Sequence, residues 1–552
     1  MTGLDRLAAV ERAARLQREA LDTLGESLAR KAGSEGSLTS IALNSIQVQA
    51  FDVARWLAES AAIRALLTHA TRNEASGFDQ QLAVLFSAQS INRMAAQIAF
   101  SHNHFGQTSQ TALESFVAEG SMLAACARPD DWTQFGREVI ERNRDLSGSP
   151  GLDDLHAGLR EIFERFSDAV IAPIAERIHR EDRIVPDNVL RQLAELGVFG
   201  ISIPEEYGGS FSDHLAMVIA TEELSRGSLG AGGSVLTRPE ICAKAILAGG
   251  TEDQKRRWLP GIASGEKMVC IAVTEPNTGS DVARVSLSAK RTTGGYVLNG
   301  EKTWATFAGR SEIICLLART GAPESGHRGL SLFIIEKPYD PEVGNEHHFR
   351  HEQPGGGLIE GRSIPTIGYR GMHSFSISFE NYVVPEENLI GQEGRGFYLQ
   401  MEGFAGGRIQ TAARAVGVME AALRSAVSYA VSRKLFGQRL ADFGLTQFKI
   451  GQMAAKVQAN RQLTYHVATL RDQGEGSSEA SLVKLLACRD AEWVTREAMQ
   501  LHGGMGYSEE YAVSRYALDA RVLSIFEGAE EVLALQVVAR PFLEKFLQPL
   551  AT

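Results

Sequence analysis

Apolar residues recur at helical spacing along the first part of the chain. Residues 1–148 are rich in Ala, Leu, Arg and Glu and contain no proline before Pro129. Within this range, Ile91, Met94 and Ile98 lie three and four positions apart, which places their side chains on one face of a helix. The pattern predicts an N-terminal helical domain over 1–148.

The pattern then changes at three points. A segment at 146–151 that is rich in Ser, Gly and Pro is typical of a linker, and helical periodicity resumes over 152–268. Over 269–391, short apolar runs such as LSLFII alternate with glycine-bearing turns, which indicates β-strands. Long amphipathic segments return over 392–552. The sequence therefore predicts an α+β protein, mostly α, in the order helical, helical, β, helical.

The composition narrows the choice of partners and of compartment. A net charge of −11 argues against nucleic acid or an anionic membrane as the main partner. The five cysteines are scattered without a metal-binding spacing, which is typical of a reducing compartment. The N-terminus carries charges throughout, and the chain has no run of about 18 apolar residues. We therefore expect a cytoplasmic protein with no membrane span.

Two segments of the predicted β-domain can cradle a cofactor. The segment IAVTEPNTGSD at 271–281 gathers hydroxyls and backbone N–H groups on one tight loop, which can hold phosphates or the edge of a ring. Asn299-Gly300 predicts a hairpin turn, and the following strand puts Trp304 and Thr306 on one face if its side chains alternate. A Trp beside a hydroxyl suits a stacked aromatic cofactor. A plain strand–turn element and a core Trp are the alternative interpretations.

Two further segments lie at predicted helix ends. In SRKLFGQ at 432–438, Arg433 offers a planar fork for a pyrophosphate. In QLHGGMGY at 500–507, three glycines allow a backbone to approach a ligand closely. A basic helix end at the surface and an ordinary glycine helix stop are the respective alternatives.

The segment RVLSIFEG at 521–528 sets one carboxylate, Glu527, among apolar residues and next to Gly528. Burial favours the neutral form of a carboxyl group, and it can turn such a group into a base that works near neutral pH. A surface glutamate in a loop is the alternative.

The order and spacing of these segments resemble the acyl-CoA dehydrogenase family over about residues 155–545, with VTEP…GSD and RKLFG among its signatures. The resemblance implies a helical domain at 152–268, a β-barrel-like middle domain at 269–391 and a C-terminal four-helix bundle at 392–552. Residues 1–148 would then form an extra helical domain. The family also implies FAD as cofactor, an acyl-CoA substrate, electron-transfer flavoprotein as electron acceptor, and a homodimer or homotetramer.

The functional residues of the family carry over position by position. Glu527 matches the catalytic base, and the family's other position for the base holds Gly407 here. Ala529 and Glu531 depart from the Thr and Gln that the family often has, so FAD contacts there are lost or remade. By the resemblance, the residues that contact the FAD of their own subunit are Val273, Thr274, Gly279, Ser280, Trp304 and Thr306. Those that reach the FAD of a neighbouring subunit are Arg433, Phe436, Gln500 and Gly504. Those that contact the substrate are Ser280, Phe404, Arg408 and Gly528.

Arg238 bears on the choice of substrate. By the resemblance it lies close to where the acyl tail ends, and a buried arginine without a partner is costly. A carboxylate on the acyl group would pair with it, bidentately if the geometry allows. This predicts an acyl group with a second carboxylate, and the resemblance implies a short, branched dicarboxylic acyl-CoA as substrate. A salt bridge to Glu240 and an outward-facing Arg238 are the alternatives.

Other functions stay open. The chain could act on another short or branched acyl-CoA, or it could be an acyl-CoA oxidase that passes electrons to O₂. A catalytically inactive relative is a third possibility, against which Glu527 counts. Metal binding by His347, His348 and His351 is a fourth, but their loop has no second carboxylate pattern, so we expect no metal.

Overall fold

The computed structural model describes residues 3–33, 37–72, 74–101, 110–210, 212–339 and 346–548. The chain forms two compact units, one of Met1–Ala157 with Thr411–Thr552 and one of Gly158–Gln410. Helices α7 (Asp154–Phe166) and α13 (Gly396–Ser432) contribute residues to both units.

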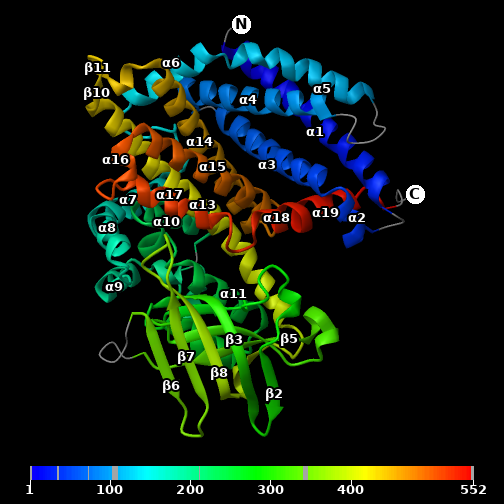
Figure 1. Cartoon of the computed structure of the whole chain (residues 1–552), viewed down its shortest axis with the longest axis vertical. Coiled ribbons are helices and arrows are strands. Elements are labelled where there is room, and N and C mark those ends of the chain that lie inside the picture. The colour runs from blue at the N-terminus through cyan, green and yellow to red at the C-terminus, as the bar shows by residue number, and fades with distance from the viewer. Residues whose placement is uncertain are drawn as a thin grey trace. The chain divides into compact units, whose positions relative to one another are not determined.

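The first unit is helical throughout. Helices α1, α3, α4 and α5 pack against one another, and α3 also packs against α14 and α15 of the C-terminal part, so both ends of the chain share one core (Figure 1). The predicted extra N-terminal helical region is thereby confirmed. This unit contains the part of α13 from Thr411 onward. Its other helices include α1 (Gly3–Ala32), α3 (Gln47–Ala70), α4 (Gly77–Ser101), α5 (Gln110–Met122), α6 (Pro129–Glu141), α14 (Gly444–Asp472), α15 (Glu479–Leu501), α16 (Gly504–Tyr507), α17 (Val513–Leu523) and α18 (Glu530–Val532).

Helices α6 and α14 cross at a glycine contact. A Cβ atom at Gly136 would lie 1.7 Å from the carbonyl oxygen of Gln447, and one at Gly451 would lie 3.0 Å from the carbonyl oxygen of Trp132. Both values are shorter than ordinary van der Waals contact, so only glycine allows this crossing distance. Trp132 is fully buried beside the crossing.

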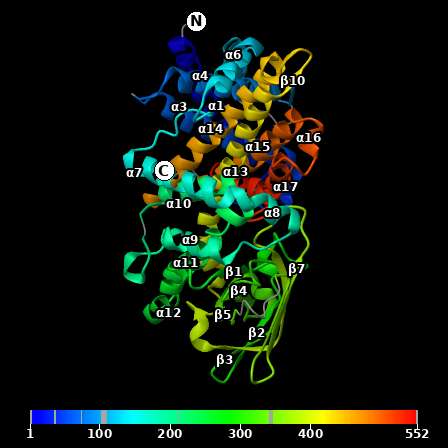
Figure 2. The same ribbon diagram turned by 90° about the vertical axis from the view of Figure 1, so that its left-hand side faces the viewer.

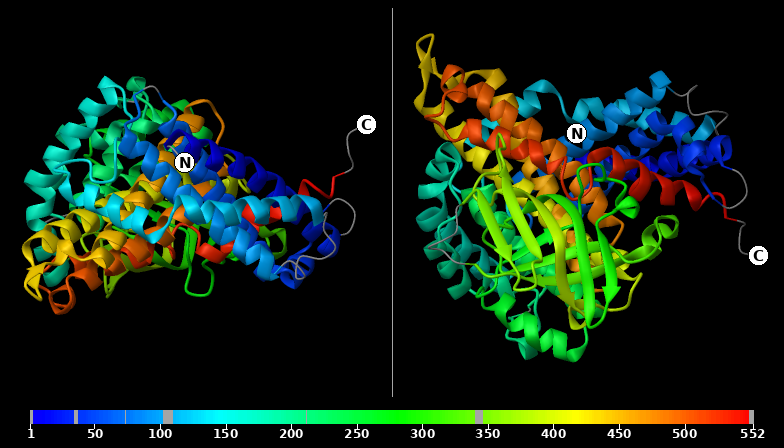
Figure 3. Two further views of the ribbon diagram at one scale, coloured as in Figure 1. Left: turned by 90° about the horizontal axis from the view of Figure 1, so that it is seen from above. Right: turned by 60° about the horizontal axis from the view of Figure 1, so that its bottom comes forward.

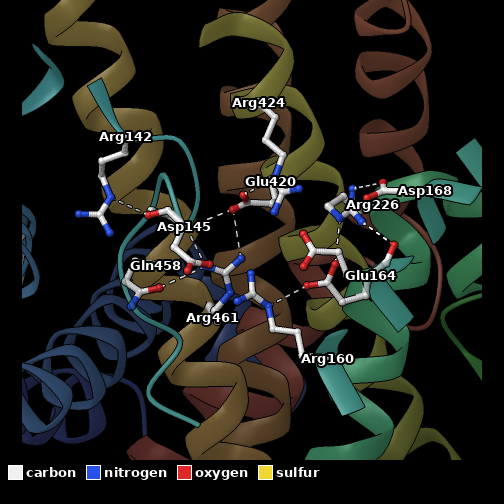
Figure 4. A network of polar contacts seen from close by, with 12 residues as sticks. Arg142, Asp145, Arg160, Glu164, Asp168, Arg226, Glu420, Arg424, Gln458 and Arg461 are labelled. Atoms are coloured by element: carbon white, nitrogen blue, oxygen red, sulfur yellow. Dashed lines mark hydrogen bonds and ion pairs between the residues drawn. The ribbon is translucent and has the colours of Figure 1, made fainter. Parts of the chain in front are cut away.

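The segment at 146–151, which the sequence predicts to be a linker, is instead tightly held within the first unit. Ser147 is fully buried, and its hydroxyl lies 2.7 Å from Arg461 Nη1 and 3.1 Å from Glu420 Oε2. Arg461 Nη2 also lies 3.1 Å from Glu420 Oε2, at the centre of the contacts in Figure 4. Gln458 donates to the Ser149 carbonyl at 2.5 Å. Buried polar groups require such partners, and a composition rich in Ser, Gly and Pro does not reveal them.

The second unit combines short helices with one nine-stranded sheet. The strands follow the order β6-β7-β8-β3-β2-β4-β5-β9, and β1 pairs with β4 in parallel. Helices of this unit are α8 (Ala172–Glu181), α9 (Asp187–Glu195), α10 (His214–Gly227), α11 (Thr237–Gly249) and α12 (Glu252–Ala263). The strands are β1 (Val269–Ala272), β2 (Ser288–Thr292), β3 (Gly295–Thr306), β4 (Ile313–Arg319), β5 (Leu330–Glu336), β6 (His348–Glu352), β7 (Leu358–Ile364), β8 (Ser374–Pro385) and β9 (Leu389–Ile390).

Alternating side chains of the strands feed two cores in this unit. One face, with Cys315 and Leu332, packs against Ile246 of α11 and Trp258 of α12, which lie beside β1 and β4 (Figure 2). Residues of the opposite face, such as Phe375, meet in a second core, and the strands curve around it (Figure 3). This arrangement confirms the fold predicted for the middle of the chain.

Ion pairs around the buried Arg226 and Glu223 join the helices of the second unit to one another. Arg226 of α10 lies 2.7 Å from Asp168 Oδ1 and 2.9 Å from Glu223 Oε2, and Arg160 lies 3.0 Å from Glu223 Oε1 (Figure 4). Burial opposes the charge of Arg226, but the two carboxylates outweigh it and raise the pKa of this guanidinium.

Candidate active site

Glu527 lies in a tight turn between α17 and α18. Its φ is +54° and that of Gly528 is +99°, so two consecutive residues have left-handed backbone conformations. Such a conformation is uncommon for a residue other than glycine, and it persists only where the surroundings hold it. Here Glu530 N donates to Ser524 O at 3.0 Å, and Lys484 Nζ donates to Gly528 O at 2.7 Å. The turn therefore fixes the direction in which Glu527 leaves the backbone.

Two residues of α13 hold the Glu527 carboxylate. The Thr411 hydroxyl donates to Oε2 at 2.5 Å, and Arg414 Nη2 lies 2.8 Å from Oε1. Arg414 Nη2 also lies 2.6 Å from Thr411 Oγ1, and its guanidinium lies 4.8 Å from the centre of the Phe526 ring. Arg414 is fully buried, and the Glu527 side chain is 10% exposed. Each oxygen of the carboxylate thus has a defined donor.

This arrangement differs from the sequence-based expectation of a carboxylate among apolar side chains. The buried guanidinium stabilises the charge of Glu527, whereas apolar surroundings would oppose it. Thr411 and Arg414 are one helical turn apart but more than one hundred positions before Glu527, so only the tertiary fold brings the three together. The available signal was an arginine within the apolar run at 412–418. Close by, burial raises the pKa of the Cys488 thiol to about 11 and keeps it protonated.

In the second unit, the loop that begins at Val273 is tied to strand β3. Thr303 N donates to Thr274 O at 2.8 Å, and the buried Lys302 donates to Val273 O and to Glu275 Oε1, both at 2.9 Å. Burial lowers the pKa of Lys302 to about 8, although Glu275 opposes this effect. The structure therefore brings Val273 and Thr274 beside the strand that carries Trp304. Sequence reasoning missed the Lys302–Glu275 pair.

Trp304 and Thr306 do not follow simple strand alternation. The pairing of β3 with β8 shifts register between Lys302 and Ala305, and Trp304 has a φ of +58°. As a result the Trp304 side chain is 54% exposed, whereas Thr306 is buried and lies 3.0 Å from the Ser374 hydroxyl. The prediction that both share one face rests on an alternation that this bulge breaks.

The predicted FAD residues of the first unit lie on exposed ends of α13 and α15. Phe436 is 90% exposed in the short hairpin of β10 (Lys434–Leu435) and β11 (Gln438–Arg439). Arg433 and Gln500 are exposed as well, and a Cβ atom at Gly504 would meet nothing within 4 Å.

One aromatic contact links these two helix ends. His502 stacks on Tyr429 with ring centroids 4.2 Å apart, and Arg433 N donates to Tyr429 O at 2.8 Å. The structure thereby brings the Arg433 segment and the Gln500–Gly504 segment close together. Burial lowers the pKa of His502 and favours its neutral form.

Both units contain surfaces that fit a flat, phosphorylated cofactor. A largely exposed tryptophan beside a polar loop provides an aromatic surface and hydrogen-bond donors, and Gly279 and Ser280 of that loop are exposed. The exposed arginine and the open glycines at the ends of α13 and α15 suit phosphate groups. The residues present are therefore compatible with FAD.

Arg238 lies in the first turn of α11 and is 7% exposed. Nη1 donates to the Ser234 carbonyl at 3.1 Å, and the guanidinium lies 5.7 Å from the centre of the Tyr369 ring. Glu240 instead pairs with Lys244 at 2.8 Å, and no described carboxylate lies within 4 Å of Arg238. Both alternative interpretations, the salt bridge to Glu240 and the outward orientation, are therefore wrong.

Two of the other predicted substrate residues, Phe404 and Arg408, lie on α13. Phe404 is half-buried and packs against the core beside α11 and α12, and the half-buried Arg408 follows one turn later. Gly407, at the family's other position for a base, is buried on the same helix and carries no acid. These placements leave the assigned contacts of Phe404, Arg408 and Gly528 as predictions.

Comparison with known sequences identifies the class of protein. Residues 153–266, 270–382 and 394–542 match the N-terminal, middle and C-terminal domains of acyl-CoA dehydrogenases. The chain belongs to the acyl-CoA dehydrogenase family. It is therefore an oxidoreductase that acts on an acyl-CoA, and its cofactor is FAD.

Individual relatives are similar over the same range. The (2S)-methylsuccinyl-CoA dehydrogenase of Cereibacter sphaeroides is 44% identical over 399 residues, which are 72% of this chain and 71% of that protein. A chain from the structural study of the electron transferring flavoprotein of Acidaminococcus fermentans is 33% identical with a TM-score of 0.65, covering 71% of this chain and 98% of its own length. The glutaryl-coenzyme A dehydrogenase in complex with glutaryl-CoA is 32% identical with a TM-score of 0.64, covering 69% of this chain and 93% of its own length.

In the described part of our chain, no helix is both long and apolar enough to cross a membrane.

Proposed function

We propose that this enzyme dehydrogenates a short, branched dicarboxylic acyl-CoA, namely (2S)-methylsuccinyl-CoA, to mesaconyl-CoA. One observation supports this substrate class above all: Arg238 is buried, yet no described carboxylate lies within 4 Å of its guanidinium. A buried arginine with spare donors favours a ligand that brings a carboxylate. The 44% identity to a (2S)-methylsuccinyl-CoA dehydrogenase supports the same choice.

In this proposal Glu527 removes the α-proton of the thioester. The α-C–H is a weak acid, so hydrogen bonds to the thioester oxygen must stabilise the developing negative charge, and we assign one of them to the backbone N–H of Glu527. Arg414 and Thr411 orient the Glu527 carboxylate before substrate arrives. Val273, Thr274 and Trp304 would hold FAD, which would supply the acceptor for the hydride that leaves the β-carbon.

The other binding residues keep the roles that the family suggests. We propose that Arg408, Ser280, Phe404 and Gly528 contact the acyl-CoA. The exposed Trp304 would lie against the flavin ring. Residues proposed to bind FAD within the subunit are Val273, Thr274, Gly279, Ser280, Trp304 and Thr306.

The exposed hairpin at Phe436 supports a homo-oligomer. An aromatic side chain that is 90% exposed next to Arg433 is unusual for a free surface and suits contact with a second copy. We propose a homodimer or homotetramer in which Arg433, Phe436, Gln500 and Gly504 reach the FAD of the neighbouring subunit.

We also propose electron-transfer flavoprotein as the electron acceptor. The five cysteines, buried and free, support a reducing compartment, the cytoplasm.

Anaerobic reduction of the bound flavin tests the substrate. (2S)-methylsuccinyl-CoA should bleach the flavin faster than butyryl-CoA at equal concentration. Arg238→Ala should raise the KM for the dicarboxylic substrate roughly tenfold or more, the value of one charged hydrogen bond, and leave that for butyryl-CoA unchanged. Arg238→Lys keeps the positive charge but loses the planar fork of the guanidinium. Its KM for the dicarboxylic substrate should lie between those of the unaltered enzyme and Arg238→Ala. Faster bleaching by butyryl-CoA would contradict the proposed substrate, and H₂O₂ release during turnover would indicate an oxidase.

A further inference from the structure

A pocket of about 200 Å³ lies in the first unit, between helices from both ends of the chain. Its walls come from α3 and α4 of the N-terminal part and from α14 and α15 of the C-terminal part, which pack together (Figure 1). Each of the four helices contributes one basic side chain, and these are Arg55, Arg93, Lys456 and Arg489. None of them is among the residues that the family resemblance assigns to FAD or to the acyl-CoA.

Two of the basic side chains pair with carboxylates of the pocket wall. Arg93 Nη2 lies 2.9 Å from Glu59 Oε1, and Lys456 Nζ lies 2.5 Å from Asp490 Oδ1. Asn460 Nδ2 donates to the other oxygen of Asp490 at 2.8 Å. This part of the wall therefore has its charges balanced within the protein, and a ligand would be held by the other two cations.

Arg55 differs from the other three, because its side chain makes no hydrogen bond to the described residues although it is only 24% exposed. The one described carboxylate within 4 Å is Asp52, whose Oδ1 lies 3.7 Å from Nη1, beyond hydrogen-bond distance. Burial and the nearby charge of Arg489 lower the pKa of Arg55, and Glu59 and Asp52 do not outweigh them. An anion between the two guanidiniums would relieve their repulsion.

We propose that this pocket binds a small organic carboxylate, whose charged group lies between Arg55 and Arg489. Two guanidinium forks suit the planar, bidentate geometry of a carboxylate. Leu485, Leu486 and the ring of Trp493 line the same pocket and offer apolar surface to the carbon skeleton of the ligand. A cavity of about 150 Å³ is enough for benzene, so this one has room for a ring or a branched chain.

One wall of the pocket is connected to the turn that carries Glu527. Arg489 Nη1 pairs with the carboxylate of Glu530. Glu530 N donates to Ser524 O at 3.0 Å, and this bond closes the turn. A bound carboxylate would compete with Glu530 for Arg489, so it would loosen the turn and slow the removal of the α-proton. This effect on the rate rests on the proposed role of Glu527, whereas binding of the ligand does not.

Calorimetric titration of the full-length holoenzyme with benzoate tests the site. Benzoate carries a planar carboxylate on an apolar ring and should bind at one molecule per chain. Benzyl alcohol has the ring without the charge and should not bind, and inorganic phosphate, without the ring, should bind at least about tenfold more weakly than benzoate. Arg55→Ala should weaken the binding of benzoate at least about tenfold, because a charged hydrogen bond is lost.

Two further variants serve as controls for Arg55→Ala. Arg64→Ala changes an exposed arginine of the same helix outside the pocket and should leave benzoate binding unchanged. Arg55→Lys keeps the charge without the fork, so its affinity should lie between those of the unaltered enzyme and Arg55→Ala, with the same flavin content. Absence of binding to the unaltered enzyme would overturn the proposal. Binding that is lost in Arg238→Ala and kept in Arg55→Ala would also overturn it, because benzoate would then lie in the acyl pocket.

The rate of flavin reduction tests the connection to the turn. Saturating benzoate should slow reduction by (2S)-methylsuccinyl-CoA about fivefold or more in the unaltered enzyme and should leave the rate of Arg55→Ala unchanged. An unchanged rate with benzoate bound to the unaltered enzyme would overturn the connection through Arg489. The calorimetric result depends neither on the proposed substrate nor on the proposed base, so failure of this site and failure of the proposed function can be distinguished.

Discussion

Arg414 Nη2 lies 2.8 Å from Glu527 Oε1, so a fully buried guanidinium pairs with the carboxylate that the family resemblance assigns as the base. Thr411 occupies the other oxygen of the same carboxylate. The two contacts hold the Glu527 carboxylate in one direction.

Replacement of Arg414 by Met should affect both stability and catalysis. Removing one partner of a buried ion pair should lower the free energy of unfolding by roughly 3 kcal/mol. The loosened carboxylate should lower kcat/KM for flavin reduction roughly 10- to 100-fold. Stopped-flow flavin reduction measures the rate, and urea unfolding measures the stability.

Thr411→Val is the matched control for this prediction. It removes one hydroxyl donor and leaves the guanidinium in place, so the free energy of unfolding should fall by only about 1 kcal/mol and kcat/KM should fall less than in Arg414→Met. An Arg414→Met enzyme with the stability and rate of the unaltered protein would show that the pair has no role.

The Lys302–Glu275 pair predicts a dependence of stability on pH. Burial opposes the charge of Glu275, but Lys302 and the donors Ser286 and Leu287 outweigh it and lower the pKa of this carboxyl. A lowered folded-state pKa stabilises the protein above the unfolded value near 4.5, and the contribution is lost as pH falls. Glu275→Gln should therefore be less stable than the unaltered protein at pH 7, and the difference should shrink below about pH 4.5. Urea unfolding at several pH values measures it, and a constant difference would contradict this account.

The crossing of α6 and α14 predicts that Gly136 cannot be replaced without cost. A Cβ atom at Gly136 would lie 1.7 Å from a backbone oxygen, so Gly136→Ala should lower the melting temperature by an amount that corresponds to about 3 kcal/mol or more. Gly158→Ala is the control, because it lies exposed within α7 with nothing within 4 Å of its Cβ position. That change should stabilise the protein by up to about 1 kcal/mol. Equal melting temperatures for the two variants would contradict the tight crossing.

The sequence predicted the order of the elements because hydrophobic periodicity is local. Helical spacing at Ile91 and Ile98 and the strand-like run at 330–335 both appear in the structure as α4 and β5. The carboxylate at Glu527 was recognisable from its family motif, and Arg238 from the cost of burying an arginine.

Other features depend on contacts that no local pattern contains. Arg414 meets Glu527 only after the helices pack, and Ser147 is held by Arg461 from a distant helix. Trp304 leaves the strand alternation because of a bulge, which depends on the register with β8. Prediction from the sequence fails at these residues because tertiary contacts override the local pattern.

The central claim is that Glu527 is the base of an acyl-CoA dehydrogenase. Glu527→Gln keeps the size and shape of the side chain and one hydrogen-bond acceptor, so the variant should still bind FAD and the acyl-CoA. Anaerobic stopped-flow mixing of this variant with (2S)-methylsuccinyl-CoA measures flavin reduction directly. The account predicts a loss of rate of roughly 10²- to 10⁴-fold, the usual contribution of a general base. Reduction of the flavin at the rate of the unaltered enzyme would contradict it.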